Sequence, residues 1–183
     1  MLIEYASSKS AGNLLRAASF GDGSLLFYDI LGVNHSKKQD KLVPILSSKV
    51  KEIIKQVVAD AKENSTVEEL PENKVVVKLD LSAFVNYGNY PQPSKIIGNL
   101  HDTMVQEHEG KSVVTLGVAD SFMMFRIDKL SASVGELIKS LQAKFPHGRI
   151  DGGGHDLIGS IRFYSGYKER ILSEISSMIT QWS

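Results

Sequence analysis

The sequence predicts an α/β protein in which a small mixed sheet with flanking helices follows a helical segment. Residues 44–63 carry apolar side chains at intervals of three and four positions, as an amphipathic helix does. Beyond residue 73, short β-branched runs alternate with helical patterns, which is typical of an α/β layer. Near the end of the chain, three consecutive glycines followed by His155 separate two of these patterns.

The first part of the chain reads as helices joined by polar connections. Helix-compatible spacing covers residues 10–18 and 24–31. Residues 32–40 are expected to form a solvated loop rather than a binding loop, although they include His35, Lys37 and Lys38.

The helix predicted over 44–63 has both acidic and basic residues on its polar face, which favours a solvated face over a nucleic-acid stripe. Residues 64–73 are polar and acidic and contain Pro71, so we expect a domain boundary there. This divides the chain into a helical segment at 1–73 and an α/β domain at 74–183.

The second domain is expected to contain strands at 74–81, 112–118, 121–127 and 159–164. Its helices are expected at 94–105, from Ser133 to Pro146, and at 167–182. Ser94 is a suitable N-cap for the first of them, and Ser133 with Glu136 forms a capping box for the second.

The composition excludes several classes of chemistry. No cysteine is present, which excludes disulfides, thiolate catalysis and cysteine-bound zinc. The 21 basic and 21 acidic residues balance, so the chain lacks the basic surplus that drives sequence-independent nucleic-acid binding. A local basic patch stays possible, and the balance suits a protein-binding role. No leader pattern or membrane span is evident, and we expect a cytoplasmic protein.

The glycine run at 152–154 has two interpretations. As a turn with exposed amides it can form an anion site, to which His155 donates a hydrogen bond. It can equally be a tight connection between two strands, with His155 as a packing or capping residue. The spacing alone does not separate these interpretations.

Other polar residues give weaker signals. Tyr87 and Tyr90 lie in a loop at 86–93, where they either stack on bases or cover an edge of the core. His101 and His108 can share a helix face, but no matching carboxylate pair completes a metal site. We therefore expect no metal and no cofactor.

Two motifs resemble RecJ-type proteins of the DHH phosphoesterase superfamily. Residues 152–160, Gly-Gly-Gly-His-Asp-Leu-Ile-Gly-Ser, resemble the glycine-histidine signature of the DHH-associated domain. Residues 15–25, Leu-Arg-Ala-Ala-Ser-Phe-Gly-Asp-Gly-Ser-Leu, resemble the segment that precedes the interdomain helix in that family. The Asp-His-His triplet that holds catalytic metal ions in RecJ nucleases does not occur in this sequence.

The resemblance implies a DHH-associated fold and a catalytically inactive, archaeal-type relative of RecJ. Such a protein would act in DNA replication as an accessory of the replicative helicase complex, docking on GINS and the MCM helicase and contacting single-stranded DNA. The nucleic-acid or phosphate contacts implied by the motifs and their surroundings are Gly152, Gly153, Gly154, His155, Arg16, Arg162, Tyr87 and Tyr90.

Two alternatives stay open at this point. The chain can be the substrate-binding part of a split DHH-type phosphoesterase whose catalytic domain is supplied by another chain. It can also be a stand-alone binder of single-stranded nucleic acid, for which affinity should fall steeply with salt.

Overall fold

The computed structural model describes residues 37–84, 91–129 and 133–182. The chain divides into two compact units, Met1–Val57 with Gly88–Pro91, and Val58–Tyr87 with Gln92–Ser183. The helices expected at 10–18 and 24–31 lie outside the described residues.

Helix α4 spans Lys37–Glu63, so it begins earlier than the predicted start at Pro44. Lys37 and Lys38 therefore lie in a helix rather than in the expected loop. Proline is favoured in a first helical turn, which made Pro44 a plausible start, but the lysines and glutamine before it also favour helix. No helix in the described ranges is long and apolar enough to cross a membrane.

Six strands form one mixed sheet in the second unit. Their spatial order is β1-β2-β3-β4-β6-β5, in which only the neighbours β2 and β3 run parallel. The bounds are Ser65–Leu70 for β1, Lys74–Asp80 for β2, Ser112–Val118 for β3, Phe122–Ile127 for β4, Asp151–His155 for β5 and Ile158–Arg162 for β6. The predicted α/β class with a small mixed sheet is confirmed.

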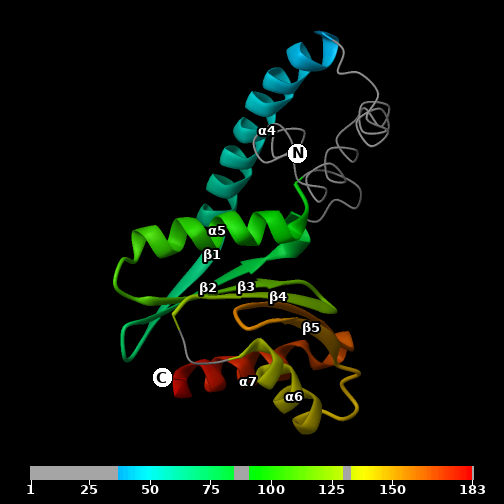
Figure 1. Ribbon diagram of the computed structural model, residues 1–183. Helices are drawn as coiled ribbons and strands as arrows, with labels where there is room; N and C mark the ends of the chain where they lie inside the picture. Colours follow the sequence, from blue (N-terminus) through cyan, green and yellow to red (C-terminus); the bar gives the residue numbers. More distant parts are fainter. Residues whose placement is uncertain (1–36, 85–90, 130–132, 183) are drawn as a thin grey trace. The chain divides into compact units, whose positions relative to one another are not determined.

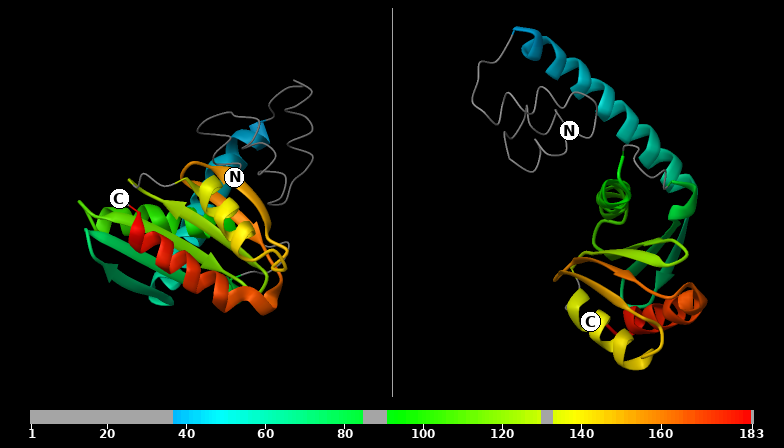
Figure 2. Two further views of the ribbon diagram at one scale, coloured as in Figure 1. Left: turned by 90° about the horizontal axis from the view of Figure 1, so that it is seen from below. Right: turned by 90° about the vertical axis from the view of Figure 1, so that its right-hand side faces the viewer.

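Helices cover both faces of this sheet (Figures 1 and 2). Helix α5 (Pro93–Glu107) lies on one face, and α6 (Val134–Lys144) and α7 (Lys168–Gln181) lie on the other. Ser133 is the N-cap of α6 as predicted, and its hydroxyl accepts a hydrogen bond from the Gly135 amide at 3.2 Å. The predicted cap at Ser94 is wrong, because α5 starts at Pro93 with Gln92 as its N-cap.

Strand β1 lies within residues 64–73, where the sequence suggested a polar connecting segment between two domains. It pairs antiparallel with β2 as an edge strand, and four of its six residues are exposed. Ion pairs hold its two glutamates: Glu68 to Lys78 at 3.1 Å and Glu69 to Lys111 at 2.8 Å. An edge strand with so little buried surface has a polar composition, which is why the sequence resembled a loop.

The two parallel strands, β2 and β3, are buried on both faces, as parallel neighbours in an α/β layer usually are. Val75, Val76 and Val77 of β2 are almost fully inaccessible, and residues 113–118 of β3 are all buried. On the side of α6 and α7, one apolar cluster joins the sheet to buried Leu137, Leu141 and their neighbours. This packing fixes the sheet on which the candidate site is built.

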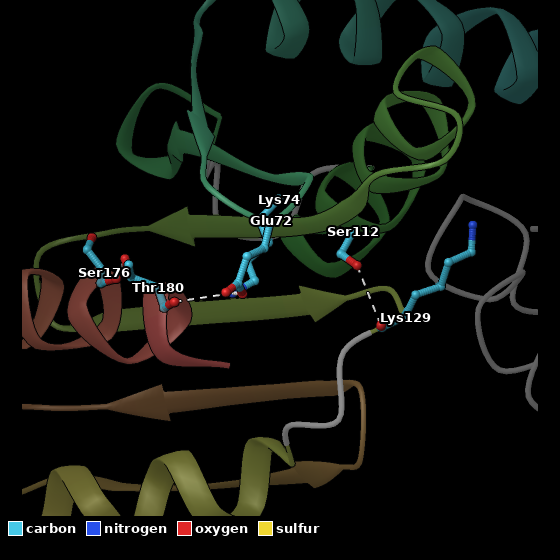
Figure 3. A network of polar contacts seen from close by, with 6 residues as sticks. All are labelled: Glu72, Lys74, Ser112, Lys129, Ser176 and Thr180. Carbon is cyan, nitrogen blue, oxygen red and sulfur yellow. Dashed lines mark hydrogen bonds and ion pairs between the residues drawn. The ribbon is translucent and has the colours of Figure 1, made fainter. Parts of the chain in front are cut away.

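Lys74 links the start of β2 to the end of α7, although its side chain is only 2% exposed. Its Nζ donates to the Glu72 carboxylate at 2.8 Å and to the carbonyl of Thr180 at 3.2 Å (Figure 3). A cation at the carbonyl end of a helix is favourable because the last carbonyls lack partners within the helix. In the same region, the Ser112 hydroxyl contacts the Lys129 carbonyl at 3.5 Å.

Candidate nucleic-acid interface

The glycine motif forms a strand, which corrects the expectation of a turn at this position. Residues Asp151–His155 make β5, which pairs antiparallel with β6, and the hairpin turn lies at Asp156 and Leu157. None of the three glycines has a φ in the left-handed region. Glycine runs usually mark turns. Here the glycines lie in a strand because the close packing of the hairpin leaves no room for larger side chains.

The backbone of β6 lies too close to β5 for side chains at two of the three glycines. A Cβ atom on Gly152 would lie 2.2 Å from the carbonyl oxygen of Ser160, and one on Gly154 would lie 2.2 Å from that of Ile158. At Gly153, no atom lies within 4 Å of the Cβ position. Two of the glycines are therefore required by the hairpin itself, and the third leaves open space.

The hairpin turn is anchored to its neighbours by two backbone hydrogen bonds. The Val134 amide at the start of α6 donates to the carbonyl of Asp156 at 3.0 Å. The Ile127 amide of β4 donates to the carbonyl of Leu157 at 2.9 Å. These bonds fix the tip of the hairpin relative to α6 and β4.

Strand pairing places three rows of side chains on one face of β4, β6 and β5. The rows, each read from β4 through β6 to β5, are Phe122, Arg162, Asp151; Met124, Ser160, Gly153; and Arg126, Ile158, His155. Helix α5 packs on this face mainly over β3 and β4. In the described part of the chain, the area over β6 and β5 is open, and the Ile158 side chain is 44% exposed there.

This open face, defined by the three rows, carries two arginines, a histidine and one carboxylate, that of Asp151. Arg162 and His155 are exposed and Arg126 is half-buried. The guanidinium of Arg126 lies beside α5, 3.5 Å from the position of a Cβ on Gly98. No ion pair or side-chain hydrogen bond joins either arginine to another residue in the described ranges. Both guanidinium groups can therefore donate to an anionic ligand.

The edge of the sheet next to this face has no side chains over most of its length. β5 is the last strand of the sheet in the described ranges, where part of its backbone has no strand partner. Backbone N–H groups are regular phosphate donors in nucleic-acid complexes. The glycines thus let a polyanion approach the strand closely.

The structure brings five of the expected site residues together: Gly152, Gly153, Gly154, His155 and Arg162, all in one hairpin. Arg16, Tyr87 and Tyr90 lie outside the described residues. Sequence reasoning missed Arg126 and Phe122 on the same face. The period-two pattern of a strand puts both residues on one face of β4, but no local signal in the sequence shows that this face is partly accessible.

His101, considered above for a metal site, is a buried residue with a hydrogen-bond partner. Its Nδ1 lies 3.0 Å from the hydroxyl of Thr115 between α5 and β3. Burial lowers the pKa of His101 below its ordinary value, an effect that the charges of Asp102 and Asp128 oppose and that of Arg126 reinforces. In the described part of the chain, no three histidine, aspartate or glutamate residues form a group able to hold a metal ion.

No protein-family model matches the sequence. An uncharacterized protein of Methanocaldococcus jannaschii is 24% identical over 168 residues, which make up 87% of this chain and 22% of that protein. A solved structure described as the DHH domain of a member of a family of ribosomal proteins matches with a TM-score of 0.78 and 24% identity. That match covers 90% of this chain and 39% of the solved one.

RecJ from Thermus thermophilus, solved in complex with Mg²⁺, matches with a TM-score of 0.49 and 12% identity, over 79% of this chain and 20% of that chain. The chain therefore spans less than half the length of the proteins that it matches. The match to the DHH-domain structure shows a shared fold, in agreement with the fold that the glycine motif led us to expect.

We predict that Gly154→Ala destabilises the protein by roughly 1–3 kcal/mol, because the methyl group would press on the Ile158 carbonyl. Gly153→Ala is the matched control and should change the free energy of unfolding by less than about 0.5 kcal/mol. Urea unfolding of the two variants measures both values. Equal effects of the two substitutions would contradict the packing described for the hairpin.

The lowered pKa of His101 predicts a pH-dependent stability. The folded state disfavours protonation, so the stabilisation is fully present above about pH 6.5 and is lost as the pH falls below it. The loss should not exceed about 1.4 kcal/mol per pH unit for this single group. Urea unfolding between pH 7.5 and pH 5 should show a smaller dependence for His101→Gln than for the wild type, and identical profiles would refute the effect.

Proposed function

We propose that this chain is a nucleic-acid-binding module of the DHH and RecJ type, which works by positioning a nucleic acid rather than by catalysis. The observation that carries the proposal is the open face of β4, β6 and β5, where two arginines without an ion pair among the described residues lie on the strands next to a glycine edge. The fold shared with a DHH-domain protein supports it, and so does the glycine-histidine motif.

The binding would rest on a small number of phosphate contacts. Arg162 on β6 and Arg126 on β4 supply charged donors from the first and the third row of the face, and the edge of β5 supplies backbone donors. His155 adds a donor at the hairpin tip. Because the chain has a net charge of zero, the attraction is local, and we expect moderate affinity rather than general DNA coating.

The biological role that we propose is a catalytically inactive accessory of DNA replication in the cytoplasm, which docks on GINS and the MCM helicase and holds single-stranded DNA. The two RecJ-like motifs support this role, as does the absence of an Asp-His-His triplet from the sequence. A balanced net charge also suits a protein that assembles with other proteins.

A second candidate function is the substrate-binding part of a DHH-type phosphoesterase. The chain corresponds to 22% of its curated relative and 39% of the DHH-domain structure, so both proteins contain further residues that can carry catalysis. In that case the open face would hold the substrate for a catalytic domain in another polypeptide segment.

Removal of Arg162 tests the nucleic-acid contact. Binding of a fluorescent oligothymidylate to Arg162→Gln should be several-fold weaker than to the wild type. The slope of log affinity against log salt should fall by about 0.7–1, because one phosphate contact is lost. Lys139→Gln removes one charge from α6 on the other face of the sheet and should change neither value. A wild-type slope in Arg162→Gln would refute the assigned contact.

The proposed partners are tested by affinity purification of the tagged chain from extract of its source cells, with nuclease treatment and a high-salt wash. Mass spectrometry should identify GINS or MCM subunits among the retained proteins. Recovery of a DHH-containing chain would favour the second candidate function instead. Recovery of neither would contradict the replication role.

A further inference from the structure

Aromatic and basic side chains gather where the chain passes from β6 into α7. The ring centroid of Tyr164 lies 6.3 Å from that of Tyr167, and the guanidinium of Arg170 lies 5.6 Å from the centre of the Tyr167 ring. The Tyr164 amide donates to the carbonyl of Gly148 at 2.8 Å, which brings the backbone of Arg149 next to this group. We call Tyr164, Tyr167, Arg149 and Arg170 the tyrosine–arginine patch.

The ring contacts place the tyrosines of this patch on the side of the sheet that α6 and α7 cover. Tyr167 makes an edge contact at 6.0 Å with Phe145, the residue that follows α6, and both rings pack against the apolar cluster beneath the two helices. Helix α5 and the open face lie on the other side of the sheet (Figures 1 and 2). The tyrosine–arginine patch is therefore separate from the candidate nucleic-acid interface.

The exposed ring of Tyr164 is held in place by its surroundings. The Tyr167 amide donates to the Tyr164 carbonyl at 2.9 Å, and the Gly148 amide donates to the Phe145 carbonyl at 2.8 Å. A Cβ atom on Gly166 would lie 3.2 Å from Cε1 of Tyr164, so the ring lies against this glycine. In the described part of the chain, no large apolar residue is more exposed than Tyr164, at 58%. A ring fixed in this way loses little conformational freedom when a partner covers it.

The two arginines of the patch have no acidic partner. Both are exposed, and neither makes an ion pair or a side-chain hydrogen bond with another residue in the described ranges. Arg149 has a φ of 49°, a conformation that is uncommon outside glycine and is kept where the surrounding structure imposes it. Both guanidinium groups can therefore donate to a carboxylate from outside the chain.

The charges next to the patch favour a protein over a nucleic acid as its partner. Exposed Glu169 precedes Arg170 on α7, and exposed Asp120 pairs with Lys168 at 3.3 Å. The repeated phosphates of a polyanion would meet these carboxylates, whereas a protein can present one acidic group between them. Tyrosine and arginine are also enriched at the centres of protein–protein interfaces.

We propose that the tyrosine–arginine patch docks a protein partner that presents a carboxylate to Arg170 and Arg149 and an apolar side chain to the ring of Tyr164. Guanidinium groups bind carboxylates through paired hydrogen bonds, which selects an acidic segment. This surface serves the protein docking proposed above, on which the inference rests, and is independent of nucleic-acid contact at the open face.

The test places a photo-crosslinking phenylalanine analogue in the full chain, either in place of Tyr164 or in place of Val67. Val67 lies on β1, at the opposite edge of the sheet from β5, and is 46% exposed. Each chain is irradiated in extract of its source cells, with and without nuclease, and mass spectrometry identifies the crosslinked peptides. We expect crosslinks from position 164, but not from position 67, to an acidic segment of one protein.

Charge reversal then tests the contact with that purified protein. Its binding to Arg170→Glu should be at least about 10-fold weaker than to the wild type. A lysine in place of the crosslinked carboxylate of the partner should restore binding to Arg170→Glu. Lys55→Glu is the matched control, because it reverses an exposed charge on α4, and it should bind like the wild type.

Crosslinks to a protein from position 67 alone would overturn the patch and leave protein docking intact. If no protein is crosslinked from either position, the patch is overturned, and the affinity purification described above decides whether protein docking survives. A crosslink from position 164 to nucleic acid in the untreated extract would overturn the choice of partner. Wild-type affinity of Arg170→Glu would overturn the carboxylate contact.

Discussion

The close approach of β6 to β5 is the constraint on which the candidate interface depends. Methyl groups at Gly152 and Gly154 would each lie 2.2 Å from a carbonyl oxygen of β6, so larger residues would force the hairpin apart. The closed hairpin leaves the middle of β5 free of side chains, and the pairing of β6 with β4 sets Arg162 beside Phe122. The close packing of the hairpin thus accounts for the access to the backbone of β5.

The two faces of the sheet differ because its helices are distributed unevenly. Helices α6 and α7 bury one face in a continuous apolar cluster, which keeps the strands in register. On the other face, α5 packs mainly over β3 and β4, so residues on β6 and β5 stay accessible. A rigid sheet that is open on part of one face suits a module that positions a strand of nucleic acid.

Local patterns in the sequence predicted the strongly periodic elements. The β-branched runs indicated β2 and β3, and Ser133 marked the start of α6. Strand β1 was missed because an edge strand buries little, and β5 was missed because glycines are locally unfavourable in strands. The accessibility of Arg126 depends on where α5 lies over the sheet, which is a tertiary property that no local pattern encodes.

The most direct measurement is an NMR titration of the isotope-labelled full chain with oligothymidylate, followed through its backbone amides. Contact through the open face predicts that shifts concentrate at Gly152, Gly153, Gly154 and Arg162 and saturate together. Shifts confined to α6 and α7, or no shifts at concentrations that bind in solution, would contradict the assignment of this face as the nucleic-acid interface.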